Sequence, residues 1–512
     1  MISVNPIIPG FSPDPSAVKV GQWFYLVNSS FHLFPGLPIY VSKDLTSWEQ
    51  IGNAIYRQDQ LSLARSKTNL SPPSATGEIL LATGGLYAPT IRHHNGTFYI
   101  ICTNSMRADR LSTHPETVKR NFIVSTNNIW ANEWSDPIYF DFDGIDPSLF
   151  FDGAKVYMQG SAQPGINMFE IDLLTGEKLS PERTIWSGSG GLYPEGPHTY
   201  KRNEWYYLMI SEGGTHENHM VTMARAKDIW GPYEMCPSNP ILTSRGTSQY
   251  IRHVGHCDVF EDDEGKWWGV FLGVRKDSSG RHILGRETFI TSGRWDGEWL
   301  TFDRVELNPT HLRRSEGRTD LCAAPNADLL YIRDPDLSKY DISNSGTQVT
   351  LTASKTDLSH PTLSPTFVGK RQRRLSGEST VTFRRPSGVS ESARLKAGLA
   401  CYKDEHRYAR VFYQPSTSEI VFQLVNNAQK TTMTKRRTIH LFEELTLQMT
   451  YTEQGYRLSY RDERGSEEGF THIASLDALA LTDTDFVGPV IGVFAVSEDD
   501  GPVVAFTNLS IE

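Results

Sequence analysis

Three acidic residues stand beside proline in short segments that lie far apart in the chain: Ser12-Pro-Asp14-Pro-Ser, Gly144-Ile-Asp146-Pro-Ser and Tyr193-Pro-Glu195-Gly-Pro. Proline removes a backbone donor and restricts φ, so it stiffens the chain around each acid. Carboxyl groups held in a fixed geometry are suited to general acid–base chemistry. For either Asp-Pro-Ser segment alone, ordinary turn chemistry is the alternative, because Asp and Ser both stabilise turns.

The sequence contains an internal repeat, and the three acids occupy equivalent positions within it. Five times, an apolar run leads through a turn into an aromatic-rich run, and successive turns are 50 to 75 residues apart. The turn residues are Gly21, Gly96, Gly153, Asn203 and Gly265. A hairpin followed by an outer hairpin in each repeat is typical of a β-propeller blade. An ordinary β-sandwich with coincidental hairpins is the alternative.

The acids share one register within the repeat. Asp14 and Asp146 each lie seven residues before the turn, and Glu195 lies eight residues before it. Equivalent points on propeller blades surround the mouth of the central channel, so we expect the three acids to converge there. The second repeat has Ala88-Pro89 at this place, so an acid is not a general structural feature of the repeat.

Composition and patterning predict an all-β protein of two domains. The 512 residues include 41 Gly, 28 Pro and 11% aromatic residues, which excludes a coiled coil, collagen and a disordered chain. Residues 1–320 hold the repeats and are predicted to form a five-bladed propeller carrying the catalytic site. Residues 321–512 show alternating strands without the repeat, which predicts a β-sandwich.

Charge, hydropathy and cysteine content limit the kinds of partner, the cellular location and the metal sites that we expect. The net charge of −10 disfavours nucleic acid, and no apolar run approaches the length of a membrane span. The N-terminus lacks the basic and apolar regions of a signal peptide, so a cytoplasmic location is predicted. The cysteines form no CxxC pair and indicate neither disulfides nor zinc; they are Cys102, Cys236, Cys257, Cys322 and Cys401.

The three acidic segments resemble the signature segments of glycoside hydrolase family 43. Three further stretches, around residues 31–39, 211–225 and 285–289, resemble its β-xylosidase branch, which carries a C-terminal concanavalin-like sandwich. The sequence differs from this branch in two places that would form the pocket wall. Tyr87 stands where the branch usually has Trp, and the segment 56–83 before it is longer.

The resemblance implies an inverting hydrolase with a role for each acid. Asp14 is then the general base, Glu195 the general acid, and Asp146 the residue that orients Glu195 and raises its pKa. Inversion requires carboxyls about 6.5 to 9.5 Å apart, so that a water fits between the base and the sugar.

The resemblance also implies further residues of the site. Arg286 would contact substrate and tune the acids, with a surface arginine as the alternative. His256 would face the channel, with a core histidine as the alternative, and a calcium ion could be bound beside it, although no cofactor is required. Phe31 and Tyr87 would stack on the sugar, with ordinary blade packing as the alternative. Thr215 is a further substrate-binding candidate, and Asp258, in the same register as the acids, is interpreted as structural.

The predicted activity is exo-acting, inverting release of xylose from non-reducing ends of β-1,4-xylo-oligosaccharides. α-L-Arabinofuranosidase activity, alone or beside it, is the nearest alternative, because the two pentoses have similar shapes. A retaining fructan hydrolase is disfavoured because its Asn-Asp-Pro and Arg-Asp-Pro segments are absent. A carbohydrate-binding propeller would not need three converging acids. The protein could form a homo-oligomer.

Overall fold

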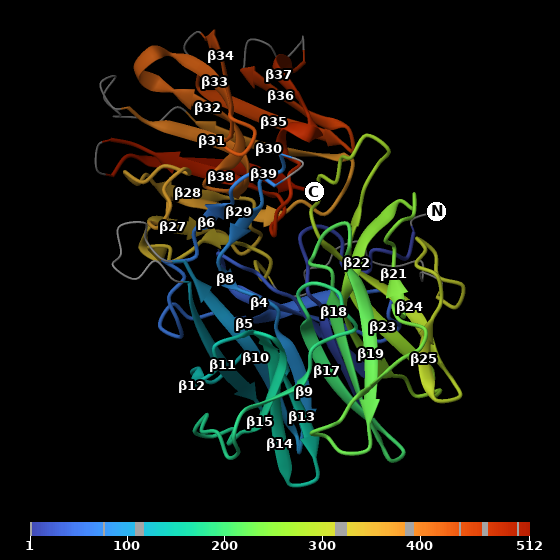
Figure 1. Cartoon of the computed structure of the whole chain (residues 1–512). Helices are drawn as coiled ribbons and strands as arrows, with labels where there is room; N and C mark the ends of the chain where they lie inside the picture. The colour runs from blue at the N-terminus through green and yellow to red at the C-terminus, as the bar shows by residue number, and fades with distance from the viewer. Residues whose placement is uncertain are drawn as a thin grey trace.

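The computed structural model describes residues 3–74, 77–107, 117–312, 325–384, 394–439, 442–462, 469–498 and 501–512. Two β-domains pack against each other, a propeller coloured blue to yellow and a sandwich coloured orange to red in Figure 1. Helices in these ranges are short 3₁₀ turns, none with the length and hydropathy of a membrane span. They are η1 (Ile129–Ala131), η2 (Leu337–Lys339), η3 (Pro415–Thr417) and η5 (Ala478–Leu481).

The predicted five-bladed propeller is confirmed, with one antiparallel sheet for each repeat. Blade one holds β1 (Ser16–Val20), β2 (Trp23–Val27), β4 (Gly36–Ser42) and β5 (Glu49–Ile55). Blade two holds β8 (Gly85–Leu86), β9 (Thr90–His94), β10 (Thr97–Met106), β11 (Val118–Thr126) and β12 (Ile138–Phe140). Blade three holds β13 (Ile145–Asp152), β14 (Lys155–Ala162), β15 (Gly165–Glu170) and β16 (Arg183–Trp186).

The last two blades complete the ring. Blade four holds β17 (Glu195–Arg202), β18 (Trp205–Glu212), β19 (Met220–Ala226), β20 (Glu234–Met235) and β21 (Leu242–Thr243). Blade five holds β22 (Ile251–Glu261), β23 (Trp267–Arg275), β24 (Glu287–Asp296) and β25 (Trp299–Phe302). The five predicted turn residues all have positive φ, between 55° and 79°, which is why Gly or Asn stands at each of them.

A buried polar cluster joins the innermost strands of all five blades. Asp258 on β22 accepts hydrogen bonds from Ser16 on β1 (2.6 Å) and Tyr200 on β17 (2.6 Å), and forms an ion pair with Arg92 on β9 (2.8 Å). His198 on β17 links Arg92 to Ser148 on β13, at 3.0 and 3.1 Å. Asp258 is fully buried, and its carboxylate oxygens are occupied by these partners. We therefore assign it a structural role, in agreement with the interpretation of the sequence.

The C-terminal domain is a sandwich of two antiparallel sheets around one hydrophobic core. One sheet has the order β27 (Tyr340–Ile342), β28 (Val349–Thr352), β39 (Val503–Ile511), β30 (Gly377–Arg384), β35 (Glu444–Thr452), β36 (Gly455–Asp462), β37 (Thr471–Asp477). The other has the order β29 (Phe367–Arg371), β38 (Val490–Val496), β31 (Lys396–Asp404), β32 (Arg407–Gln414), β33 (Glu419–Asn426), β34 (Thr431–Thr438). The predicted boundary between residues 320 and 321 lies outside the described residues, as does Cys322.

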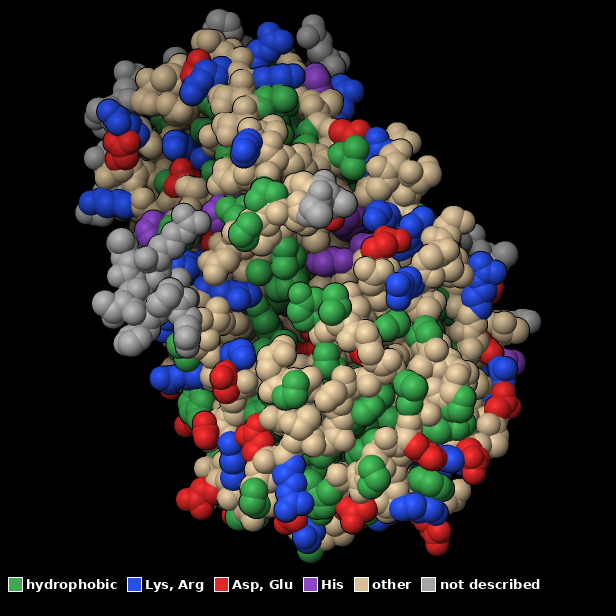
Figure 2. Space-filling view, viewed as in Figure 1, with side chains coloured by type: hydrophobic (Ala, Val, Ile, Leu, Met, Phe, Trp, Pro, Cys, Tyr) green, Lys and Arg blue, Asp and Glu red, His purple; other side chains and the backbone are tan. Residues whose placement is uncertain are grey.

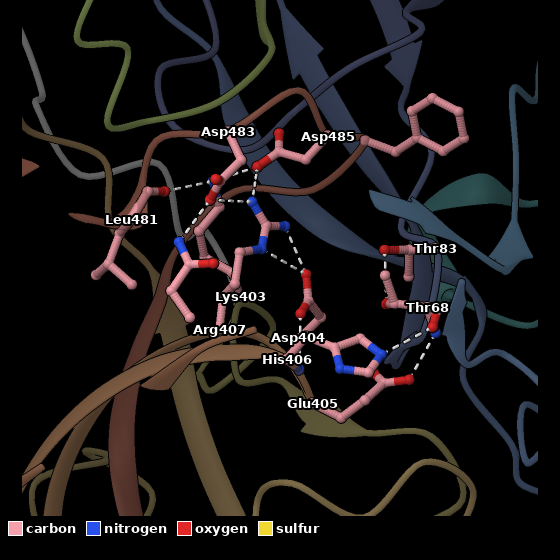
Figure 3. A network of polar contacts seen from close by, with 12 residues as sticks. Thr68, Thr83, Lys403, Asp404, Glu405, His406, Arg407, Leu481, Asp483 and Asp485 are labelled. Carbon is pink, nitrogen blue, oxygen red and sulfur yellow. Dashed lines mark hydrogen bonds and ion pairs between the residues drawn. The ribbon is translucent and has the colours of Figure 1, made fainter. Parts of the chain in front are cut away.

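Strand pairing and buried charges hold the domains together. β3 (Leu33–Phe34) of the propeller pairs with β26 (Tyr331–Ile332). The longer segment before Tyr87 contains a hairpin, β6 (Thr68–Leu70) with β7 (Leu81–Thr83), that docks on the sandwich. Figure 3 shows the docking contacts: Thr68 donates its backbone N–H to Glu405 (2.6 Å), and its carbonyl lies 3.0 Å from Nε2 of His406.

Candidate active site

One pocket on the propeller face that meets the sandwich contains all eight predicted site residues. Its volume is about 70 Å³. At roughly 10 to 15 Å³ for each water, this is space for about five to seven waters, the scale of one pentose ring. The predicted residues lining it are Asp14, Phe31, Tyr87, Asp146, Glu195, Thr215, His256 and Arg286. The three acids therefore converge from blades one, three and four.

Unusual backbone conformations turn the acids into the pocket. Asp14 and Asp146 both have φ of 53°, a left-handed conformation in which Asp is enriched among residues with a side chain. The register of β13 against β14 shifts just after Ile145, and that of β17 against β18 shifts just after Glu195. Such bulges redirect side chains next to functional sites. The Asp-Pro-Ser segments thus place a strained residue at the site, two residues before β1 in one case and at the second position of β13 in the other.

Asp14 is held by two partners. Arg286 donates from Nη1 to Oδ1 of Asp14 at 3.0 Å, and the Ser29 hydroxyl donates to the other carboxylate oxygen. The same Nη1 lies 3.0 Å from the Thr215 hydroxyl, and Nη2 of Arg286 donates to the Phe486 carbonyl at 2.9 Å. Arg286 is buried, with 6% of its surface exposed, so the surface-arginine alternative is wrong.

Glu195 lies in the most strongly perturbed environment of the three acids. Burial raises the pKa of Glu195 to about 8; the Asp146 and Asp14 carboxylates act in the same direction, and Arg286 opposes them. Burial also raises the pKa of Asp146 to about 6, opposed by His256. The raised pKa favours the protonated form of Glu195 at neutral pH, and the lower pKa of Asp146 favours its carboxylate form.

A glycine next to Glu195 fixes Asp146. The Gly196 backbone N–H donates to Oδ2 of Asp146 at 3.1 Å. Gly196 has φ of 59°, and a Cβ there would lie 2.9 Å from the His256 ring, so only glycine fits between Glu195 and His256. The His256 backbone N–H donates to the Ser211 hydroxyl at 2.6 Å, which places its ring against the pocket. The Pro-Glu-Gly segment therefore lies in contact with both Asp146 and His256 and carries Glu195 between them.

The aromatic wall has a contributor from the second domain. Phe31 and Tyr87 lie 5.2 Å apart between ring centroids, and Phe486 of the sandwich lies 6.0 Å from Phe31 and 6.2 Å from Tyr87. Arg286 stacks over both phenylalanines. Sequence reasoning missed Phe486, which lies in a different domain and has no motif around it.

Four other lining residues were also missed: Ala88, Ile145, His219 and Leu272. His219 is the polar one. Its ring packs on Gly255, its Nδ1 lies 3.0 Å from the His253 carbonyl, and burial lowers its pKa to about 3. His219 is therefore a neutral group that can hydrogen-bond a sugar hydroxyl. Its position directly before β19, the strand that pairs with β18, is the only signal that pointed to it.

The site offers few ligands for a resident metal. Within the described ranges, no group of three or more His, Cys, Asp and Glu side chains could hold an ion directly. Calcium takes six to eight oxygen ligands, and the acids nearest His256 are those already hydrogen-bonded within the pocket. The residues near His256 thus do not fit a directly coordinated calcium.

Comparison with known proteins defines the class. The model of glycosyl hydrolases family 43 matches residues 3–300, and that of the beta xylosidase C-terminal concanavalin A-like domain matches residues 324–510. The chain belongs to glycosyl hydrolase family 43 and is a glycoside hydrolase, as the three acidic segments indicated.

Its relatives include proteins with both predicted activities. A non-reducing end α-L-arabinofuranosidase, BoGH43B of Bacteroides ovatus, is 31% identical over 98% of this chain and 92% of that protein. A xylosidase/arabinosidase of Butyrivibrio fibrisolvens is 39% identical over 58% of this chain and 56% of that protein. The crystal structure of a xylan β-1,4-xylosidase from Bacillus halodurans is 25% identical, with a TM-score of 0.84 over 99% of each chain.

Proposed function

We propose that the protein is an exo-acting, inverting glycosidase that releases xylose from the non-reducing ends of β-1,4-xylo-oligosaccharides. The observation that carries this is the pocket itself, because it has the scale of one pentose ring and is walled on one side by Phe486 of the second domain. A pocket of this size with one side bounded by the second domain accepts the end of a chain, whereas an endo-acting enzyme requires a groove that is open at both ends. The family membership and the xylosidases among the relatives support the choice of sugar.

The charges support distinct roles for two acids. Glu195, with its raised pKa, is the protonated group that can donate to the leaving oxygen. Asp14 is paired with Arg286 at 3.0 Å, and a carboxylate held in this way is suited to take a proton from water. The catalytic step then forms a bond between water oxygen and the anomeric carbon, breaks the glycosidic bond, and moves one proton to Asp14 and one from Glu195.

In this proposal, Asp146 raises the pKa of Glu195. Its carboxylate is oriented by the Gly196 N–H, next to Glu195, and its charge favours the protonated form of the acid. Arg286 and Thr215 orient Asp14 and present donors to sugar hydroxyls, while Phe31, Tyr87 and Phe486 exclude water. We infer that no metal or other cofactor is required, because carboxyl groups supply both proton transfers.

α-L-Arabinofuranosidase activity is the second candidate. The full-length relative from Bacteroides ovatus carries that name, and the pocket wall of this chain has Tyr87 in a place where the resemblance expects Trp. Nitrophenyl β-xyloside and nitrophenyl α-L-arabinofuranoside, assayed side by side, test both candidates. We expect turnover of the xyloside to exceed that of the arabinofuranoside. Turnover of the arabinofuranoside alone would select the second candidate, and turnover of neither would overturn the proposal.

A further inference from the structure

The backbone that carries Phe486 is in close contact with the backbone that carries Arg286. A Cβ on Gly488, two residues after Phe486, would lie 2.6 Å from the Leu284 carbonyl oxygen, so only glycine allows the two chains to approach this closely. A Cβ on Gly285, directly before Arg286, would lie 3.0 Å from the Gly488 Cα. The sandwich segment is therefore fixed against the propeller on the C-terminal side of Phe486.

On the N-terminal side of Phe486, the Asp485 carboxylate is bound to two cations of the sandwich. Asp485 is 4% exposed and accepts hydrogen bonds from Nζ of Lys403 and Nη1 of Arg407 (Figure 3), both of which are buried. Burial acts to raise the pKa of Asp485, but the two cations outweigh burial and lower it. Asp485 is therefore charged at neutral pH and holds its place by ionic contacts.

The two cations lie at the turn that joins β31 to β32. Lys403 also donates to the Leu481 carbonyl at 2.9 Å, and Nε of Arg407 donates to the Asp404 carboxylate at 3.0 Å. β31 and β32 are paired neighbours in the six-stranded sheet, with Asp404 opposite Arg407. The ion pairs of Asp485 thus attach the Phe486 segment to the sheet itself.

The same turn is bound to the segment that leads to Tyr87. Glu405 accepts a hydrogen bond of 2.6 Å from the Thr68 backbone N–H (Figure 3). Thr68 pairs with Thr83 across the β6–β7 hairpin, and the Thr83 carbonyl accepts a hydrogen bond of 3.1 Å from the Tyr87 hydroxyl. One turn of the sandwich therefore contacts the segments of both Tyr87 and Phe486, which stand together in the pocket wall.

The Phe486 ring has aromatic neighbours on several sides. Phe31 and Tyr87 lie on the side of the pocket, and His216 lies on the side of the hollow where the domains meet, with ring centroids 6.5 Å apart and planes 14° apart. Figure 2 shows histidine side chains gathered in that hollow. Such ring contacts are individually weaker than a buried ion pair. The position of the ring therefore depends on the backbone that Asp485 holds.

We propose that Asp485, through its ion pairs with Lys403 and Arg407, is a positioning residue for the active site. It holds the Phe486 ring at the pocket and the Phe486 carbonyl at the Arg286 guanidinium. The inference rests on the proposed function, because the roles of Phe486 and Arg286 toward the sugar are assigned there. A protein without these ion pairs keeps its three acids but binds the sugar less well.

The first test is the variant Asp485→Asn, which keeps the shape of the side chain and removes its charge. We expect KM for nitrophenyl β-xyloside to rise and kcat/KM to fall about tenfold. A residue that only stabilised the fold would change the amount of active protein, and so kcat, but not KM. The matched control is Asp357→Asn, which breaks ion pairs with Lys396 on β31 and Arg410 on β32 and should leave KM unchanged.

A double-mutant cycle shows whether Asp485 acts through Phe486. In protein that already carries Phe486→Ala, adding Asp485→Asn should lower kcat/KM by less than about threefold, because the ring that Asp485 positions is absent. If the two losses simply multiply, Asp485 acts independently of Phe486 and the inference is overturned.

A second variant covers the case in which Asp485→Asn does not fold, because removing one partner of a buried ion pair leaves an uncompensated charge. Arg407→Lys keeps a cation in the cluster but cannot bind Asp404 and Asp485 from two sides, so KM should again rise, by a smaller factor. An unchanged KM in the folded variants would overturn the inference. Failure of the proposed function has a different signature, because the unaltered protein would then not turn over the xyloside.

Discussion

Arg286 of the propeller donates a hydrogen bond of 2.9 Å to the backbone carbonyl of Phe486 in the sandwich. The same guanidinium forms the ion pair with Asp14, at 3.0 Å. The second domain therefore contacts the group that orients the proposed general base, besides supplying a wall of the pocket. The candidate active-site pocket is formed by both domains together, although all three acids lie on the propeller.

The wall supplied by Phe486 gives the first prediction. Phe486→Ala should raise KM for nitrophenyl β-xyloside and lower kcat/KM by about tenfold, because the sugar loses an apolar contact and the pocket opens to water. Phe486→Leu, which keeps most of the volume, should lose less. Steady-state kinetics of the two variants test this. Equal kinetic constants in Phe486→Ala and the unaltered protein would show that the ring does not contact the sugar.

The stereochemical course follows from Asp14 acting on water. NMR of fresh product from a β-xyloside should show α-xylose first, before mutarotation. A nucleophilic carboxylate would instead give β-xylose through a covalent intermediate. Initial β-xylose would therefore contradict the role assigned to Asp14.

The leaving group separates the two catalytic acids. Glu195→Ala should lose far more activity on xylobiose than on an aryl xyloside, because nitrophenolate departs without a proton. Asp14→Ala should lose activity on both substrates, by at least the ~10²–10⁴-fold typical of general acid–base catalysis. The opposite pattern, with leaving-group dependence only in Asp14→Ala, would mean that the roles are exchanged.

The pH profile reports on the charge next to Glu195. In the proposed mechanism activity requires protonated Glu195, so kcat/KM on xylobiose should fall as pH rises through its pKa of about 8 in the free protein. Asp146→Asn removes a negative charge that raises this pKa, so the pKa of Glu195 falls and the basic limb moves to lower pH. Profiles on xylobiose measure the shift. A basic limb that stays in place or moves to higher pH would contradict the proposed action of Asp146.

Removal of metal ions tests the carboxyl-only chemistry. Prolonged treatment with a chelator should leave most xylosidase activity intact, because Asp14 and Glu195 carry both proton transfers. The measurement is activity before and after chelation, with calcium added back to a third sample. Loss of activity that calcium restores would demonstrate an essential ion in the region of His256.

Much of the fold was predictable because the blade repeat is local. Each blade needs a hairpin with a positive-φ turn residue, and Gly21, Gly96, Gly153, Asn203 and Gly265 provide it within short stretches of sequence. The alternating strands of the sandwich are equally local patterns. The buried polar cluster around Asp258 was not predictable in the same way, because the partners of Asp258 come from different blades and share no motif.

The sequence by itself determined which acids converge, because Asp14, Asp146 and Glu195 occupy one register of a repeat that closes into a ring. Only the tertiary structure decided what encloses them. Phe486 reaches the pocket through the packing of one domain on another, and the β6–β7 hairpin docks against a distant segment of the sandwich. Such contacts depend on the fit between surfaces far apart in the chain, and that fit leaves no periodic pattern among neighbouring residues.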